Sequence, residues 1–238
     1  MTTSVIQNNP NWYPAIFLRV CTAIFRNLKQ QYLQQSKWNF PLCLGSIDRK
    51  YINFRAPRSA GSYFYNYKGD HSIVLLAVAD ANYKFLYVDV GVNGRVSDGG
   101  VYSESSLKLA IDRGKLNLPT DECLPDQDIP IPYTFIADDA FPLSKRIMKP
   151  FNNRGLTNDK RILNYRLSRA RRVVENAFGI LANRFRILLN TINLSPDKVE
   201  LITLTCCVLH NFLLSKNPKY KKIAINNNKL PNLVQIQG

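Results

Sequence analysis

The longest uninterrupted apolar run in the chain, residues 73–79, constrains the fold more than any other feature. Both of its alternating sets are apolar: Ile73, Leu75 and Ala77 in one, and Val74, Leu76 and Val78 in the other. A strand with this pattern is buried on both faces, so the sheet that contains it must be covered on each side. The run is far shorter than the ~18 residues that a membrane span needs. The full length of 238 residues suffices for one α/β domain with a substantial core.

Three other segments are predicted as strands, residues 42–54, 83–91 and 133–137. Asp80, Ala81 and Asn82 are turn-forming residues, so strand 72–79 and strand 83–91 form a hairpin. A helix capped by Ser97 or Asp98 should then run towards Asp112, followed by a long loop over residues 116–132. A short helix is predicted around residues 144–148.

The best-defined predicted element is a long helix that follows Asn158 or Asp159 as its cap. Its apolar positions step by three or four and form one stripe: Leu163, Leu167, Ala170, Val174, Phe178, Leu181, Phe185 and Leu188. A last helix begins at the Ser195 cap and Pro196 and is apolar from Val199 to Leu214. This order predicts a mixed sheet of three antiparallel strands plus a parallel crossover strand, covered by helices. That α/β order is the order of an RNase H-like fold.

The cysteines and the charge narrow the class of protein. Five cysteines without CxxC spacing exclude a zinc ribbon and argue against a disulfide framework, which predicts a reduced intracellular protein. The net charge is +15, and residues 141–190 carry twelve bases against two acids. Such a surplus attracts polyanions, of which nucleic acid is the commonest inside cells. A basic surface that serves only solubility is the alternative.

A few acids stand where strands and a helix could aim them at one point. Asp48 lies within the first strand, Asp138 and Asp139 end the fourth, and Glu175 is nearly alone among the arginines of the long helix. Three such carboxylates could hold Mg²⁺ or Mn²⁺, which would clamp and activate a phosphate. The structural alternative is that Asp48 ends a turn, the aspartate pair caps a helix, and Glu175 pairs with Arg171. Spacing by itself leaves both interpretations open.

Five blocks of sequence, in register, resemble PIF/Harbinger-type transposases and the host nucleases derived from them. They are WNFPLCLGSIDRKYI (38–52), VGVNGRVSDGGV (90–101), FIADDAFP (135–142), RARRVVENAFGILANRF (169–185) and CCVLHNF (206–212). The resemblance implies an RNase H-like domain over residues 41–215 with a DDE triad that binds divalent metal. It would cut DNA strands and join a 3′-hydroxyl to target DNA. The triad and metal ligands would be Asp48, Asp138 and Glu175.

Three departures from the family pattern bear on whether the protein is catalytically active. After the first aspartate the family usually has Gly and, two residues further on, His, where this chain has Arg49 and Tyr51. The region ahead of Asp48 is also shorter than is usual. Two hypotheses follow: an active metal-dependent DNA nuclease, or a DNA- or chromatin-associated protein that kept the fold without turnover. Asp98 of the SDGG block is interpreted as a helix cap or as a part of the site.

The partners follow from the charge and the resemblance. DNA is the expected ligand, and its backbone contacts are assigned to Arg169, Arg171, Arg172 and Arg184. The resemblance implies a nuclear location and a separate Myb-like DNA-binding partner that chooses the target. No membrane is expected, and a homo-oligomer is left open. Residues 1–40 are predicted to be helical, and residues 216–238 to form a basic tail.

Two smaller features complete the analysis. His210 and Asn211 are interpreted as a buried polar pair or as helix-packing residues. The alternation of Tyr63, Tyr65 and Tyr67 would either stack on bases or form an exposed hairpin edge.

Overall fold

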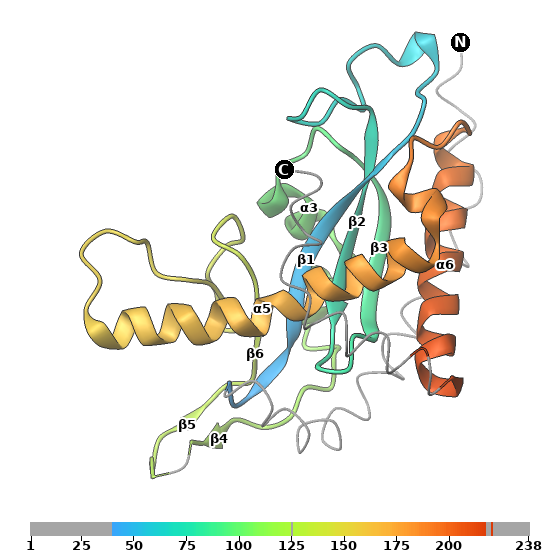
Figure 1. Cartoon of the computed structure of the whole chain (residues 1–238). Coiled ribbons are helices and arrows are strands. Elements are labelled where there is room, and N and C mark those ends of the chain that lie inside the picture. The colour runs from blue at the N-terminus through green and yellow to red at the C-terminus, as the bar shows by residue number, and fades with distance from the viewer. Residues whose placement is uncertain (1–39, 125, 218–219, 221–238) are drawn as a thin grey trace.

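The computed structural model describes residues 40–124, 126–217 and 220. Nearly all of the expected N-terminal helical segment, and residues 221–238 of the expected tail, therefore lie outside the described residues. The described part is an α/β domain built around one twisted sheet, with helices on both faces (Figure 1).

The main sheet has five strands in the order β3-β2-β1-β6-β7. β1 (Cys43–Asn53), β2 (Ser72–Ala79) and β3 (Phe85–Asn93) are antiparallel neighbours, whereas β6 (Thr134–Ile136) pairs in parallel with β1. The predicted three antiparallel strands with a parallel crossover are therefore confirmed.

β7 (Ile147–Met148) corrects one prediction, because residues 144–148 were expected to form a short helix. Ile147 instead pairs with Phe135 of β6, and its side chain is fully buried. The Ser144 hydroxyl accepts a hydrogen bond from the Ile147 N–H at 3.1 Å and forms a turn at this point. Pairing with β6 and burial in the core outweigh the local helical pattern.

Burial of β2 on both faces is confirmed, since all eight of its residues are buried. Ile73, Leu75 and Ala77 pack in one cluster with α5 (Asn158–Arg184) and α6 (Pro196–Lys216). Val74, Leu76 and Val78 pack in a second cluster on the opposite face. That second face is covered by α3 (Asp98–Glu104) and α4 (Ser106–Asp112).

The pair α3 and α4 divides a segment that the sequence predicts as one helix. Ser105 has extended backbone angles between them, and its hydroxyl accepts from the Lys108 N–H at 3.2 Å, so it caps α4. Within the expected loop, β4 (Glu122–Cys123) and β5 (Pro130–Ile131) form a small hairpin. Two 3₁₀ turns, η2 (Arg58–Ala60) and η3 (Arg186–Leu189), complete the described elements.

In Figure 1, α5 crosses over β1 and α6 stands beside β3. The cap of α5 is Thr157, one residue before the expected position. Of the predicted α5 stripe, Leu163 and Phe185 are half-buried and the other members are buried.

By length and composition α6 could cross a membrane, with a mean hydropathy of 1.3 over its best window. In this domain one face of α6 packs on the sheet, with Val199, Cys206 and Leu214 in the core. The Asn211 side chain donates to the Phe85 carbonyl at 2.8 Å and accepts from the Phe85 N–H at 2.9 Å, at the outer edge of β3. His210 is fully buried and hydrogen-bonds the Tyr83 carbonyl and the Tyr220 hydroxyl. Both residues are therefore helix-packing residues, as predicted.

Candidate active site

Three elements bring the predicted carboxylates to one region of the sheet. β6 ends beside Ser46 of β1, so Asp138, two residues past its end, emerges next to Asp48. The Ser46 hydroxyl donates to the Arg171 carbonyl at 3.3 Å, which fixes α5 against this part of β1. Glu175 lies one helical turn after Arg171. The three acids thus come from the middle of a strand, from a strand end and from a crossing helix.

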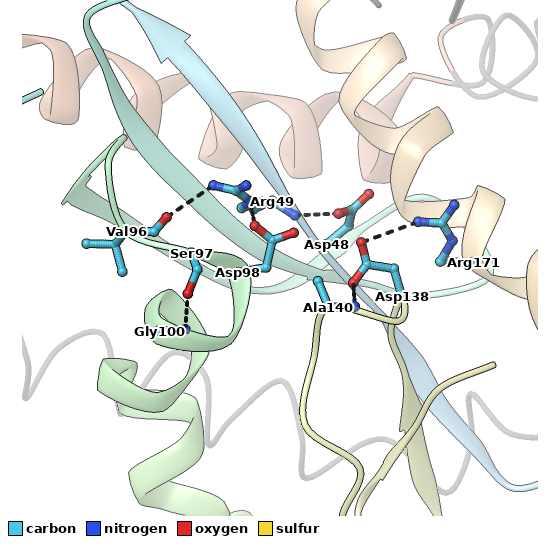
Figure 2. A network of polar contacts seen from close by, with 9 residues as sticks. All are labelled: Asp48, Arg49, Val96, Ser97, Asp98, Gly100, Asp138, Ala140 and Arg171. Atoms are coloured by element: carbon cyan, nitrogen blue, oxygen red, sulfur yellow. Dashed lines mark hydrogen bonds and ion pairs between the residues drawn. The ribbon is translucent and has the colours of Figure 1, made fainter. Parts of the chain in front are cut away.

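The Arg171 guanidinium lies among these acids. It approaches the Asp138 carboxylate at 3.9 Å (Figure 2). It also forms an ion pair with the Glu175 carboxylate at 2.8 Å, and its charge acts on Asp48. The i,i+4 pair with Glu175, one of the structural alternatives, is therefore present. The contact with Asp138 was not foreseen, because nothing in the sequence shows that the end of β6 lies opposite this turn of α5.

The remaining structural alternatives do not hold. Asp48 lies within β1 and ends no turn. No helix follows Asp138 for it to cap: its carboxylate accepts from the Ala140 N–H at 3.1 Å and closes a turn. Asp139 is exposed, and its carbonyl accepts from the Lys149 ammonium at 3.0 Å.

Burial dominates the electrostatics of Asp48. Loss of hydration raises the pKa of its carboxyl to about 7, although the Arg49 N–H, which donates to it at 2.8 Å, and Arg171 both lower that pKa. The carboxylates of Asp138 and Glu175 raise it further. A carboxyl in this setting needs a nearby positive charge to be ionised at neutral pH.

Arg49 does not enter this acidic cluster. Successive side chains of a strand point to opposite faces, so Asp48 faces α5 whereas Arg49 faces α3. There Arg49 forms an ion pair with Asp98 and donates to the Val96 carbonyl at 3.4 Å (Figure 2). Its guanidinium also lies over the Tyr51 ring. The arginine in place of the family's Gly is thus accommodated without crowding Asp48.

Asp98 is free for this pairing because it is not the helix cap. The Ser97 hydroxyl accepts from the Gly100 N–H and caps α3, which places Asp98 in the first helical turn (Figure 2). Burial raises the pKa of Asp98, and Arg49 lowers it. Of the two caps that the sequence offered, the structure uses Ser97.

The other predicted DNA contacts are spread along α5. Arg169, Arg172 and Arg184 are all exposed. At about 100° per residue, Arg169 and Arg184 point well away from Arg171 and Glu175, whereas Arg172 lies three residues before Glu175 and on the same side of the helix. Arg184 lies twelve residues after Arg172, a distance of ~18 Å along the helix. The structure therefore brings only Arg171 into the acidic cluster, and the DNA contacts stay a prediction.

The donor set suits a hard divalent cation, because three carboxylates converge on a single positive charge. In the present arrangement Arg171 supplies that charge. Within residues 40–124, 126–217 and 220, no three His, Cys, Asp or Glu side chains are close enough to form a metal shell. The residues fit a metal by type and direction, and a bound cation would take over the role of the guanidinium.

Comparison with known proteins defines the class. The sequence profile described as DDE superfamily endonuclease matches residues 47–211, which include all three carboxylates, and the chain belongs to this family. More narrowly, it is related to the Harbinger-type branch. It is 29% identical to "Protein ALP1-like" of Arabidopsis thaliana over 73% of this chain and 43% of that protein.

It is also 28% identical to the rat protein named "Putative nuclease HARBI1", over 81% of this chain and 51% of that protein. The human protein of the same name is 29% identical over 73% of this chain and 46% of its own length. The chain thus spans about half the length of the curated relatives it matches. No solved structure matches the chain significantly.

Proposed function

We propose that this protein is a metal-dependent DNA endonuclease of the transposase type, with Asp48, Asp138 and Glu175 as metal ligands on an RNase H-like fold. The convergence of three carboxylates from β1, β6 and α5 on one guanidinium carries the proposal. The strand order and the parallel crossover from β1 to β6 support the fold assignment.

A divalent cation held by these carboxylates would polarise a DNA phosphate and activate the attacking water or 3′-hydroxyl. The protein's own groups position the ligands. The Arg49 N–H orients the Asp48 carboxylate, and the Ala140 N–H orients Asp138. Arg171 offsets the repulsion between the acids, and its guanidinium is well suited to bind a phosphate. Cleavage followed by strand transfer, a nuclear location and a Myb-like partner belong to the same proposal.

A second candidate is a non-catalytic DNA- or chromatin-associated protein. Its support is that Arg171 contacts both Asp138 and Glu175, so that a positive charge of the protein itself already occupies the place between these acids.

Nicking of supercoiled plasmid in Mg²⁺ or Mn²⁺ distinguishes the nuclease from the non-catalytic candidate. We expect the full chain to nick DNA only with metal, and Glu175→Gln to abolish nicking. Asp159→Asn, which removes an exposed acid of the same helix, should retain nicking. In parallel, a metal at 100 times its Kd should stabilise the wild type by about 2.7 kcal/mol, and Glu175→Gln much less. Salt-dependent DNA binding with neither nicking nor metal stabilisation would favour the second candidate.

A further inference from the structure

The two residues at which the chain departs from the family pattern take part in one contact beside the acidic cluster. The Arg49 guanidinium lies 4.5 Å from the centre of the Tyr51 ring. On the same face, the Tyr51 ring lies 5.8 Å from the ring of Tyr67, which belongs to the loop between β1 and β2. Arg49 therefore packs on Tyr51, and Tyr51 packs on Tyr67.

Tyr67 differs from the other two tyrosines of its loop. The Tyr63 ring packs edge-on against Phe64 at 4.9 Å, and the Tyr65 ring lies 4.2 Å from His71, so both contact neighbours within the loop region. Tyr67 contacts a strand residue instead, and 78% of it is exposed, the largest exposed fraction among the described aromatic residues. An exposed aromatic ring beside a second ring of a strand is the type of platform on which a nucleic acid base stacks.

Two lysines accompany this platform. The Lys68 ammonium lies 5.8 Å from the centre of the Tyr67 ring, and its charge also acts on Lys50. Lys50 follows Asp48 by two residues on β1, so it faces the same side as the acidic cluster. Within the described part of the chain, no carboxylate forms a salt bridge with Lys50. An anion from outside the domain can therefore supply the counter-charge.

The outer edge of β1 connects this surface to the acidic cluster. β6 pairs with β1 only up to Ser46, and among the described strands none pairs with that edge between Ile47 and Ile52. Asp48 and Tyr51 are three residues apart, ~10 Å along a strand. Their side chains point to opposite faces of the sheet, so a DNA strand that contacts both must pass over this open edge.

We propose that Lys50, Tyr51, Tyr67 and Lys68, here called the Tyr67 surface, bind an unpaired DNA strand that leads away from the phosphate held at Asp48. Tyr67 stacks on a base of this strand beyond the open edge of β1, and the two lysines contact the intervening phosphates. An unpaired strand is favoured over duplex because its bases have faces open for stacking. The proposal rests on the proposed nuclease function, and it goes further by naming the form of DNA that the site prefers.

Fluorescence anisotropy with labelled DNA in EDTA tests this without cleavage. The probes are a blunt duplex and the same duplex with a five-nucleotide single-stranded extension, mixed with the full chain. Stacking of one base contributes ~1–3 kcal/mol, so Tyr67→Ala should weaken binding of the extended probe about 5- to 150-fold. Tyr67→Phe keeps the ring and should bind like the wild type. Because Tyr67 is mostly exposed, each variant should melt at the wild-type temperature.

The outcomes separate this inference from the proposed function. Selective loss for the extended probe in Tyr67→Ala, with blunt-duplex binding unchanged, supports the Tyr67 surface. Equal binding of both probes by the wild type and by Tyr67→Ala overturns it, while leaving the nuclease proposal to the plasmid assay. Failure of the wild type to bind either probe overturns both.

Discussion

Substitution of Asn211 tests how much its hydrogen bonds to β3 contribute to the packing of α6 on the sheet. Its side-chain amide makes two hydrogen bonds, one with the N–H and one with the carbonyl of Phe85, at the outer edge of β3. No strand among the described residues pairs with this edge, because β3 is the first strand of the sheet order. Asn211→Ala removes both hydrogen bonds and leaves both Phe85 groups without a protein partner.

The expected loss in the free energy of unfolding follows from these contacts. Two neutral hydrogen bonds contribute about 2 kcal/mol net to the free energy of unfolding. The Phe85 N–H and carbonyl, left unpaired and poorly reached by water, cost about 1 kcal/mol more. The higher helix propensity of Ala returns about 0.5 kcal/mol. We therefore expect a loss of about 2.5 kcal/mol in the free energy of unfolding. For a protein of this size, that loss lowers Tm by about 5–10 °C.

Thermal unfolding followed by circular dichroism measures the shift, and hydrogen exchange reports on the Phe85 amide directly. Ser215→Ala is the matched control: it removes an exposed hydroxyl that bonds only within α6, to the Asn211 carbonyl, and should change the free energy of unfolding by less than about 0.5 kcal/mol. A Tm drop below about 2 °C in Asn211→Ala, or a Phe85 amide as protected as in the wild type, would refute the reasoning.

Three further variants test other parts of the structure. Gly45→Ala should lose about 2–4 kcal/mol, because Gly45 has φ +145° and an added Cβ would lie 2.9 Å from the Ala79 carbonyl oxygen; a urea midpoint equal to that of the wild type contradicts this. Gly179→Ala should gain about 0.5–1 kcal/mol, because an added Cβ on this helical residue meets nothing within 4 Å; a lower Tm would reveal a contact that we have not recognised. Burial lowers the pKa of His210 below its usual 6.5, so its contribution to stability is full above pH 6.5 and is lost as the pH falls through its folded-state pKa. Urea titrations should therefore show the wild type losing up to about 1.4 kcal/mol per pH unit below 6.5 relative to His210→Gln; parallel pH profiles of the two proteins would exclude His210 as the cause.

Patterns within single segments predicted the elements that carry the core. The doubly apolar pattern of β2 predicted burial on both faces, and the three-or-four spacing predicted the buried stripe of α5, because both periodicities are local properties of a strand and a helix. Ile147 and Met148 lacked such a signal. A strand of two residues forms because it pairs with β6. That pairing depends on residues outside the segment, so the pattern of the segment itself does not predict it.

For the candidate site, the sequence by itself predicted which residues carry the proposed chemistry. Asp48, Asp138 and Glu175 stand in recognisable blocks, and all three lie in the matched family region. Only the tertiary structure decided their surroundings. The register of β1 turns Asp48 towards α5 and Arg49 towards Asp98, and the crossing of α5 over β1 places Arg171 between the acids. The contacts of Arg49 with Asp98 and of Arg171 with Asp138 join residues more than thirty positions apart. They therefore depend on strand pairing and helix packing, which no local pattern encodes, whereas the i,i+4 pair of Arg171 with Glu175 is a local one.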